Sequence, residues 1–277
     1  MSRVRASGGL AMCVCALAGP ASASPASASA SAPASASTPA PTLAAEASPS
    51  AKLHVAFIPD LAGARTTIEL SLNIRGASGG APAPLRSMAL RLPAGMGIAT
   101  TTLGQENCAP ASLIAAGLNG CSANALLGFG SATAVVPVGS RTVIEHAALH
   151  PLMGPAHENE VEVLFYAQAS TPVFAQLVLP GVLEEDAAPF GERLQTSVPL
   201  VEVWPEGPDL ALQSILATIG PEHLTYHRRV GSKSVPYRPR GIRIPSQCPA
   251  RGYPFGALLS FIDGTTATAT FHVGCPR

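Results

Sequence analysis

Apolar and polar residues alternate over two stretches near opposite ends of the chain. From Thr66 to Arg75, TTIELSLNIR, the apolar side chains occupy every second position. The stretch Thr266 to Val273, TATATFHV, repeats this pattern. Because successive side chains of a β-strand point to opposite faces, the alternation predicts strands with one buried face and one solvated face.

Further strand-length runs lie between these two stretches, and most of them end at Pro, Gly or Asp. They are Leu85 to Leu92, Ser131 to Val138, Thr142 to Leu149, Glu160 to Tyr166, Val173 to Leu179, Val198 to Trp204 and Phe255 to Ile262. Leu212 to Ile219 has helical as well as strand spacing, and we favour a strand. Pro110 to Ala116, closed by Gly117, predicts one short helix.

Short strands with turn residues between them, and without long amphipathic helices, predict an all-β fold. The expected architecture is an antiparallel β-sandwich, immunoglobulin-like or jelly-roll-like. The dipeptide Asp263–Gly264 between two strands predicts a two-residue type I′ turn. The region 52–277 is expected to be one domain, or two β halves divided near 151–159.

The first 51 residues have a different composition. Arg3 and Arg5 precede the apolar stretch Leu10 to Ala18 and the small-residue site Ala21 to Ala23. This is the pattern of a secretory signal peptide, residues 1–23. Residues 24–51 are almost wholly Ala, Ser and Pro, which predicts a disordered linker. No run of 18 apolar residues occurs, so no transmembrane segment is expected after signal cleavage.

Four cysteines remain after the signal: Cys108, Cys121, Cys248 and Cys275. In an exported chain an even set predicts disulfides, and four cysteines allow three pairings. Proximity in sequence favours Cys108 with Cys121 and Cys248 with Cys275. The competing interpretation is a zinc site, but no C-x-x-C occurs after the signal.

The chain carries 17 basic and 17 acidic residues, which argues against a nucleic-acid partner. The charges are nevertheless segregated. Residues 145–206 hold ten acids and one base, whereas residues 223–251 hold seven bases and no acid. The two stretches are expected to pair with each other or to recruit a partner. For an outside partner, an anionic cell-wall polymer or an envelope protein, the candidate anion-binding residues are Arg228, Arg229, Arg238, Arg240 and Arg243.

Catalytic patterns are weak. Residues 76–80, GASGG, match the serine-hydrolase elbow, but the sequence after them does not predict the helix that this motif needs. His146 with His150, and His223 with His227, have a spacing that brings two ligands together on a helix but about 13 Å apart on a strand. A loop metal site could use His150, His157, Glu158 and Glu160. Carboxylates for glycoside hydrolysis could come from Glu160 with Glu162, or from residues 184–186.

Several phrases occur in a characteristic order: LRLPAGMGI at 90–98, GCSANALLGFGSATA at 120–134, VEVLFYAQASTPVFAQLVLPG at 161–181, YRPRGIRIPSQCP at 237–249 and YPFGALLSFIDGT at 253–265, with FHVGCPR at the end. By these phrases the chain resembles a group of uncharacterised exported β-rich proteins of high-GC actinobacteria. The resemblance implies a secreted β-rich protein with the same four cysteines. It implies no activity and transfers no catalytic residue.

We therefore expect a secreted or envelope-associated, disulfide-stapled module with a binding or structural role. We expect no catalytic residue, no metal site and no cofactor. The alternative is an extracellular carbohydrate-active or metal-assisted hydrolase on the same sandwich.

Overall fold

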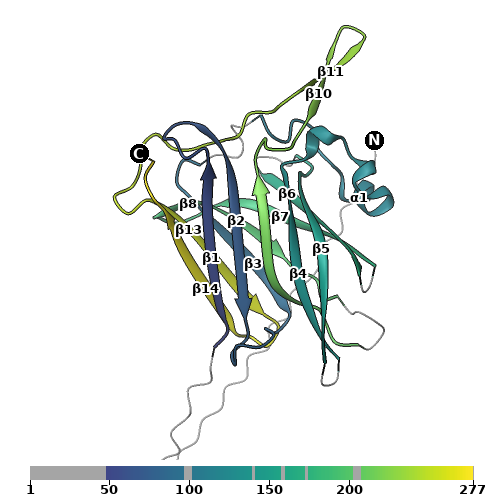
Figure 1. Ribbon diagram of the computed structural model, residues 1–277, viewed down its shortest axis with the longest axis vertical. Coiled ribbons are helices and arrows are strands. Elements are labelled where there is room, and N and C mark those ends of the chain that lie inside the picture. The colour runs from purple at the N-terminus through teal and green to yellow at the C-terminus, as the bar shows by residue number, and fades with distance from the viewer. Residues whose placement is uncertain are drawn as a thin grey trace, which may run out of the picture. The chain divides into compact units, whose positions relative to one another are not determined.

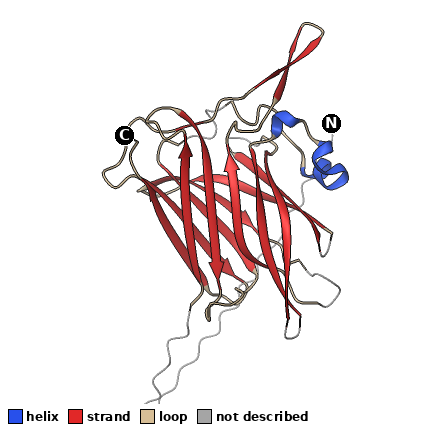
Figure 2. Ribbon diagram, viewed as in Figure 1, coloured by secondary structure: helices blue, strands red, loops and turns tan. Residues whose placement is uncertain are grey.

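Strands make up most of the part of the chain that the computed structural model describes (Figure 1, Figure 2). The described residues are 48–96, 102–138, 141–156, 160–171, 174–201 and 207–276. The expected signal peptide and nearly all of the expected linker lie outside them. All described residues belong to one compact unit.

The strands are β1 (Ser50–Ile58), β2 (Arg65–Arg75), β3 (Leu85–Pro93), β4 (Gly128–Val138), β5 (Arg141–Met153), β6 (Val161–Thr171), β7 (Ala175–Glu185), β8 (Phe190–Ser197), β9 (Ala211–Ile219), β10 (Tyr226–Val230), β11 (Lys233–Tyr237), β12 (Ile242–Arg243), β13 (Tyr253–Phe261) and β14 (Thr266–Val273). The helices are α1 (Pro110–Ala116) and the 3₁₀ turns η1 (Gly117–Gly120) and η2 (Ala123–Ala125). No helix of the described residues is long and apolar enough to cross a membrane.

Twelve strands form one antiparallel sheet with the order β1-β2-β9-β4-β5-β6-β7-β8-β3-β13-β14, and β12 pairs with β2. The first and last strands of this order come together, since the rings of His54 on β1 and Phe271 on β14 lie 4.8 Å apart. The sheet is therefore nearly closed (Figure 1). Strands β10 and β11 form a separate hairpin.

The alternation predicted from the sequence is the alternation observed. On β2, Ile68, Leu72 and Ile74 are buried, whereas Glu69 and Asn73 are exposed. These apolar side chains face the interior of the sheet. Aromatic rings from β1 and β13 pack there as well, with Phe57 5.7 Å from Tyr253 and 5.9 Å from Phe255. The all-β, antiparallel character predicted from the sequence is confirmed.

A second, smaller core lies on the outer face of the sheet. Leu113 of α1 packs with Leu152, Leu164 and Tyr166. The neighbours of these three in sequence, such as Val163 and Phe165, point to the other face, where the main core is. The helix predicted for Pro110 to Ala116 is confirmed, and it covers the outside of β5 and β6.

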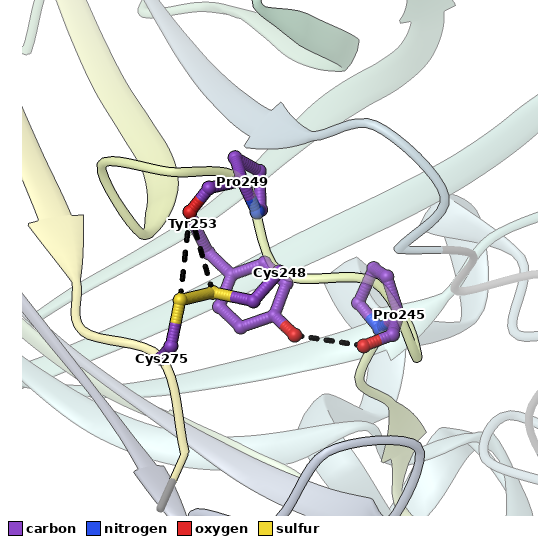
Figure 3. The surroundings of a disulfide bond; sticks show 5 residues. All are labelled: Pro245, Cys248, Pro249, Tyr253 and Cys275. Atoms are coloured by element: carbon purple, nitrogen blue, oxygen red, sulfur yellow. Dashed lines mark hydrogen bonds between the residues drawn. A yellow bond between two sulfur atoms is a disulfide. The ribbon is translucent and has the colours of Figure 1, made fainter.

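Both predicted disulfides are present. Cys108 pairs with Cys121 across the α1 loop, and Cys248 pairs with Cys275. Figure 3 shows the second bond, whose two sulfur atoms lie 3.6 and 3.4 Å from the carbonyl oxygen of Pro249. Beside it, the buried Tyr253 hydroxyl donates to the Pro245 carbonyl over 2.7 Å. The bond ties the segment after β14 to the loop before β13.

Three expectations differ from the structure. Residues 198–201 do not form a strand: Val198, Pro199 and Val201 line the interior, and Leu200 is exposed. Residues 202–206 lie outside the description. The prediction of a type I′ turn at Asp263–Gly264 is wrong. That turn needs a positive φ at both residues, and only Gly264 has one, at 83°. The Asp263 carboxylate instead accepts the Thr265 amide at 2.9 Å, an Asx-type turn. Strand β1 begins at Ser50, just inside the expected linker.

Candidate functional site

Alanines occupy seven of the inward positions of β4, β5, β6, β7 and β9, alongside larger residues such as Leu149, Phe165 and Ile215. The alanines are Ala132, Ala134, Ala147, Ala167, Ala169, Ala175 and Ala217. The inward positions of β2, β3 and β13 instead carry Leu, Ile, Met and Phe. About eight strands enclose an interior that side chains can just fill. Eleven strands with alanines along one side leave space unfilled.

That space is an apolar cavity of about 200 Å³. Its walls come from β2 to β9 and from β13, together with Val198, Pro199, Val201 and Leu210 in the connection between β8 and β9. An engineered apolar cavity of about 150 Å³ stays dry and binds benzene. By proportion, this cavity has room for a ligand of about eight carbon atoms, or for one end of a longer chain.

Two polar side chains occur among the described residues that line the cavity, Glu145 and Thr196. Glu145 is buried on β5, opposite Ala134 of β4. Thr196 of β8 is 1% exposed and stands in register with Gly181 of β7 and Met88 of β3. Among the described residues, the Thr196 hydroxyl oxygen has no hydrogen-bond partner.

A group of acids lies at the hairpin of β7 and β8. Glu185 stands directly opposite Glu192, and burial raises the pKa of Glu192. Asp186 accepts two hydrogen bonds from Arg91, which hold the pKa of that carboxyl below its usual range. A carboxyl of raised pKa beside a second one is what general acid catalysis uses. Neither Glu185 nor Glu192 lines the cavity, and the hydrolase alternative stays a prediction.

Four of the five predicted anion-binding arginines lie on the hairpin β10–β11 or just after it. Arg228 and Arg229 lie on β10, Arg238 and Arg240 follow β11, and Arg243 lies on β12; all five are exposed. The hairpin β10–β11 stands out from the large sheet (Figure 1). The Arg228 guanidinium lies 5.7 Å from the centre of the Tyr237 ring.

The base of this hairpin is held firmly. Tyr226 is fully buried, donates to the Leu126 carbonyl and accepts the Gly104 amide at 3.0 Å. Its burial raises its pKa to about 12. The Asn124 side chain exchanges two hydrogen bonds with the backbone of His227, at 2.7 and 2.8 Å. The arginines are therefore presented on an anchored element.

The register adds a basic residue that the sequence analysis missed. Arg243 on β12 stands directly opposite Arg65 on β2, and both are exposed. Like charges directly opposite across strands repel each other. No ion pair between described residues joins the acids of 145–201 to the bases of 228–251. Glu158, Glu202 and Glu206 lie outside the description.

The other motifs are dispersed. Residues 76–80 follow β2, and the chain continues to β3 without a helix, so they form a strand connection. His146 and His150 lie along β5, and burial lowers the pKa of His150. His223 and His227 are exposed. The described residues contain no group of three or more His, Cys, Asp or Glu that could hold a metal. His157 and Glu158 lie outside them.

No family model, curated protein or solved structure matches this chain. The resemblance to exported actinobacterial proteins therefore depends on the sequence phrases alone, and a proposal of function depends on the geometry described above.

Proposed function

We propose that this chain is an exported, non-catalytic binding protein that holds a small apolar ligand inside its sheet. The observation that carries the proposal is the apolar cavity of about 200 Å³. Ligand sites are typically apolar cavities with a few polar groups that fix orientation. Transfer of an apolar ligand from water into such a space gains about 25 cal/mol for each Å² buried.

The two disulfides support a site of action outside the cytoplasm, because paired cysteines persist in oxidising compartments. The two-layer sandwich also belongs to this proposal. Strands β4, β5 and β6 would form one layer and β8, β3 and β13 the other, with the ligand between them. Residues of both groups line the cavity, which favours this arrangement.

Neighbouring alanines on β5 provide the test. Ala147 lines the cavity, whereas Ala148 is exposed on the other face. Titration of the oxidised protein with 1-octanol in a calorimeter should show saturable binding to one site. Ala147→Phe fills the cavity and should reduce affinity at least tenfold, and Ala148→Phe should leave it unchanged. Equal binding by both variants, or no saturable binding by the wild type, would refute the proposal.

A second candidate function is the binding of an anionic polymer by the hairpin β10–β11 and the loop that follows it. The supporting observation is a set of exposed arginines without acidic partners among the described residues, on an anchored hairpin. Guanidinium groups bind phosphate and carboxylate oxygens through paired hydrogen bonds. The partner would be a cell-wall polymer rich in such groups.

Retention on immobilised teichoic acid, a polymer of phosphate groups, tests this second function. Arg238→Ala combined with Arg240→Ala should weaken binding about tenfold, since each charge-assisted hydrogen bond contributes about 1.5–3 kcal/mol before screening by salt. The matched control removes the same charge from exposed arginines of β3 and β5, with Arg86→Ala combined with Arg141→Ala. Equal retention of the two double variants would reject a specific anion site.

A further inference from the structure

We infer that the cavity selects neutral ligands with a hydroxyl group, which Thr196 anchors by a hydrogen bond. This inference depends on the proposed function, because it names the chemical class of the ligand in the same cavity. It starts from an unusual feature of Thr196. The residue is only 1% exposed, and no described residue forms a hydrogen bond with its hydroxyl oxygen.

A buried hydroxyl without a partner is unfavourable. It has lost its hydrogen bonds to water and gained none in return, so the penalty of desolvation is not offset. Valine has nearly the same shape and would avoid this penalty at an inward position of a strand. A ligand that supplies the missing hydrogen bond would remove it. The hydroxyl is therefore placed for an occupant of the cavity.

Thr196 lines the cavity, so an occupant of the cavity can approach its hydroxyl from that side. The side next to β7 is closed. Gly181 stands opposite Thr196, and a Cβ on Gly181 would lie 2.7 Å from the Thr196 hydroxyl oxygen and 3.2 Å from the Phe165 ring, so only glycine fits there. Apart from Thr196, this part of the wall consists of Met88, Leu194 and Phe165. The other polar residue of the lining, Glu145, lies on β5. The wall around Thr196 therefore offers one polar anchor, which suits a ligand with one polar group.

The lining also determines the charge of the ligand. No Lys, Arg or His is among the described residues that line the cavity. A carboxylate buried there would lack a cation, and burial of an unpaired charge is strongly unfavourable. The anchor therefore fits an alcohol better than a fatty acid.

Three probes of similar length test the inference by calorimetry on the oxidised full-length protein: 1-octanol, nonane and octanoate. Thr196→Val should weaken 1-octanol binding about fivefold to tenfold, the worth of one hydrogen bond. It should leave nonane binding unchanged or slightly tighter. Thr196→Ser keeps the hydroxyl and should retain the preference for 1-octanol. Octanoate should bind the wild type more weakly than 1-octanol does.

Thr66→Val is the matched control. Thr66 is also 1% exposed, but its hydroxyl donates to the Pro59 carbonyl at 2.9 Å and it does not line the cavity. Loss of the Thr66 hydroxyl in Thr66→Val should lower the melting temperature and leave the ratio of 1-octanol to nonane affinity unchanged. In the unliganded protein, Thr196→Val should instead raise the melting temperature, because it removes an unsatisfied group.

The outcomes separate the two proposals. If 1-octanol and nonane both bind the wild type but Thr196→Val changes neither affinity, or both equally, the anchor is refuted and the cavity function stands. If octanoate binds as tightly as 1-octanol, the preference for neutral ligands is wrong. If no probe binds the wild type, the proposed function fails, and the anchor fails with it.

Discussion

Glu192 illustrates how one inward position on a strand changes an acid group. It alternates on β8 with Leu194 and Thr196, which both line the cavity, so its carboxyl points toward the same side of the sheet. Burial raises its pKa, and Glu185 stands directly opposite. The same residue type on the outer face, Glu184, is instead paired with Arg193 at 2.7 Å.

The raised pKa of Glu192 predicts a pH dependence of stability. The folded chain binds this proton more tightly than the unfolded chain does. The free energy of unfolding therefore falls as the pH rises from the ordinary glutamate pKa through the raised value. Glu192→Gln should remove this fall and raise the melting temperature at pH 7, measured by circular dichroism between pH 4 and 8. Glu184→Gln, which loses an exposed ion pair, should not raise it. A Glu192→Gln variant that melts below the wild type at pH 7 would contradict this interpretation.

Elements that are distant in sequence are joined at the β7–β8 hairpin. Arg91 of β3 donates two hydrogen bonds to Asp186 beyond the end of β7, and its guanidinium lies 4.0 Å from the centre of the Phe190 ring. The Asp186 side chain is only 5% exposed, whereas the Glu184 and Arg193 side chains are 41% and 44% exposed. The two ion pairs differ mainly in burial and geometry.

This difference predicts unequal contributions to stability. Arg91→Met should reduce the free energy of unfolding by about 1–3 kcal/mol, because the Asp186 carboxylate loses both hydrogen bonds from the guanidinium and keeps only the one from the Ala187 amide. Arg193→Met should cost less than about 1 kcal/mol, as is usual for an exposed pair. Urea unfolding at pH 7 measures both. Since the pKa of Asp186 is lowered, its contribution should be lost as the pH falls toward that value. If Arg91→Met and Arg193→Met reduce the free energy of unfolding equally at pH 7, the Arg91–Asp186 pair does not contribute more to stability than the exposed pair.

At the scale of the whole molecule, the cavity exists because the order of the strands closes the sheet around an interior. Strand β9 inserts between β2 and β4, and β13 pairs with β3, so the first and last strands of the described sheet come together. Closure of this path places the alanine-rich strands β4 to β7 on one side of an enclosed interior. The large side chains of β2, β3 and β13 do not reach across it.

The whole-molecule arrangement also bears on the segregated charges. Most bases of 228–251 lie on a projecting hairpin and on the segment after it, and Arg243 lies on β12 (Figure 1). In the β7–β8 region, Asp186 pairs with Arg91 and Glu184 pairs with Arg193. Proximity of the two charged stretches was one expectation from the sequence, and the described residues give no ion pair that supports it.

The sequence alone determined the local features of this protein. Alternation of apolar and polar residues determined most of the strands, because strand burial repeats every two residues. Short separation predicted both cysteine pairs, because nearby cysteines close small loops. Four strand regions were missed. Strand β1 alternates but begins inside the segment rich in Ala, Ser and Pro, and β12 has only two residues. In the charged hairpin of residues 226–237 and in Phe190–Ser197, glycine and charged residues interrupt the pattern.

Only the tertiary structure decided which strands become neighbours and what their inward faces enclose. Ala147 and Ala148 are identical in the sequence, yet one lines the cavity and the other faces solvent. Nothing in the local sequence distinguishes Thr196 from other threonines in strands. Only the strand pairing places Gly181 and Met88 beside it. The physical reason is that strand pairing and closure depend on contacts between residues far apart along the chain, which a local pattern does not contain.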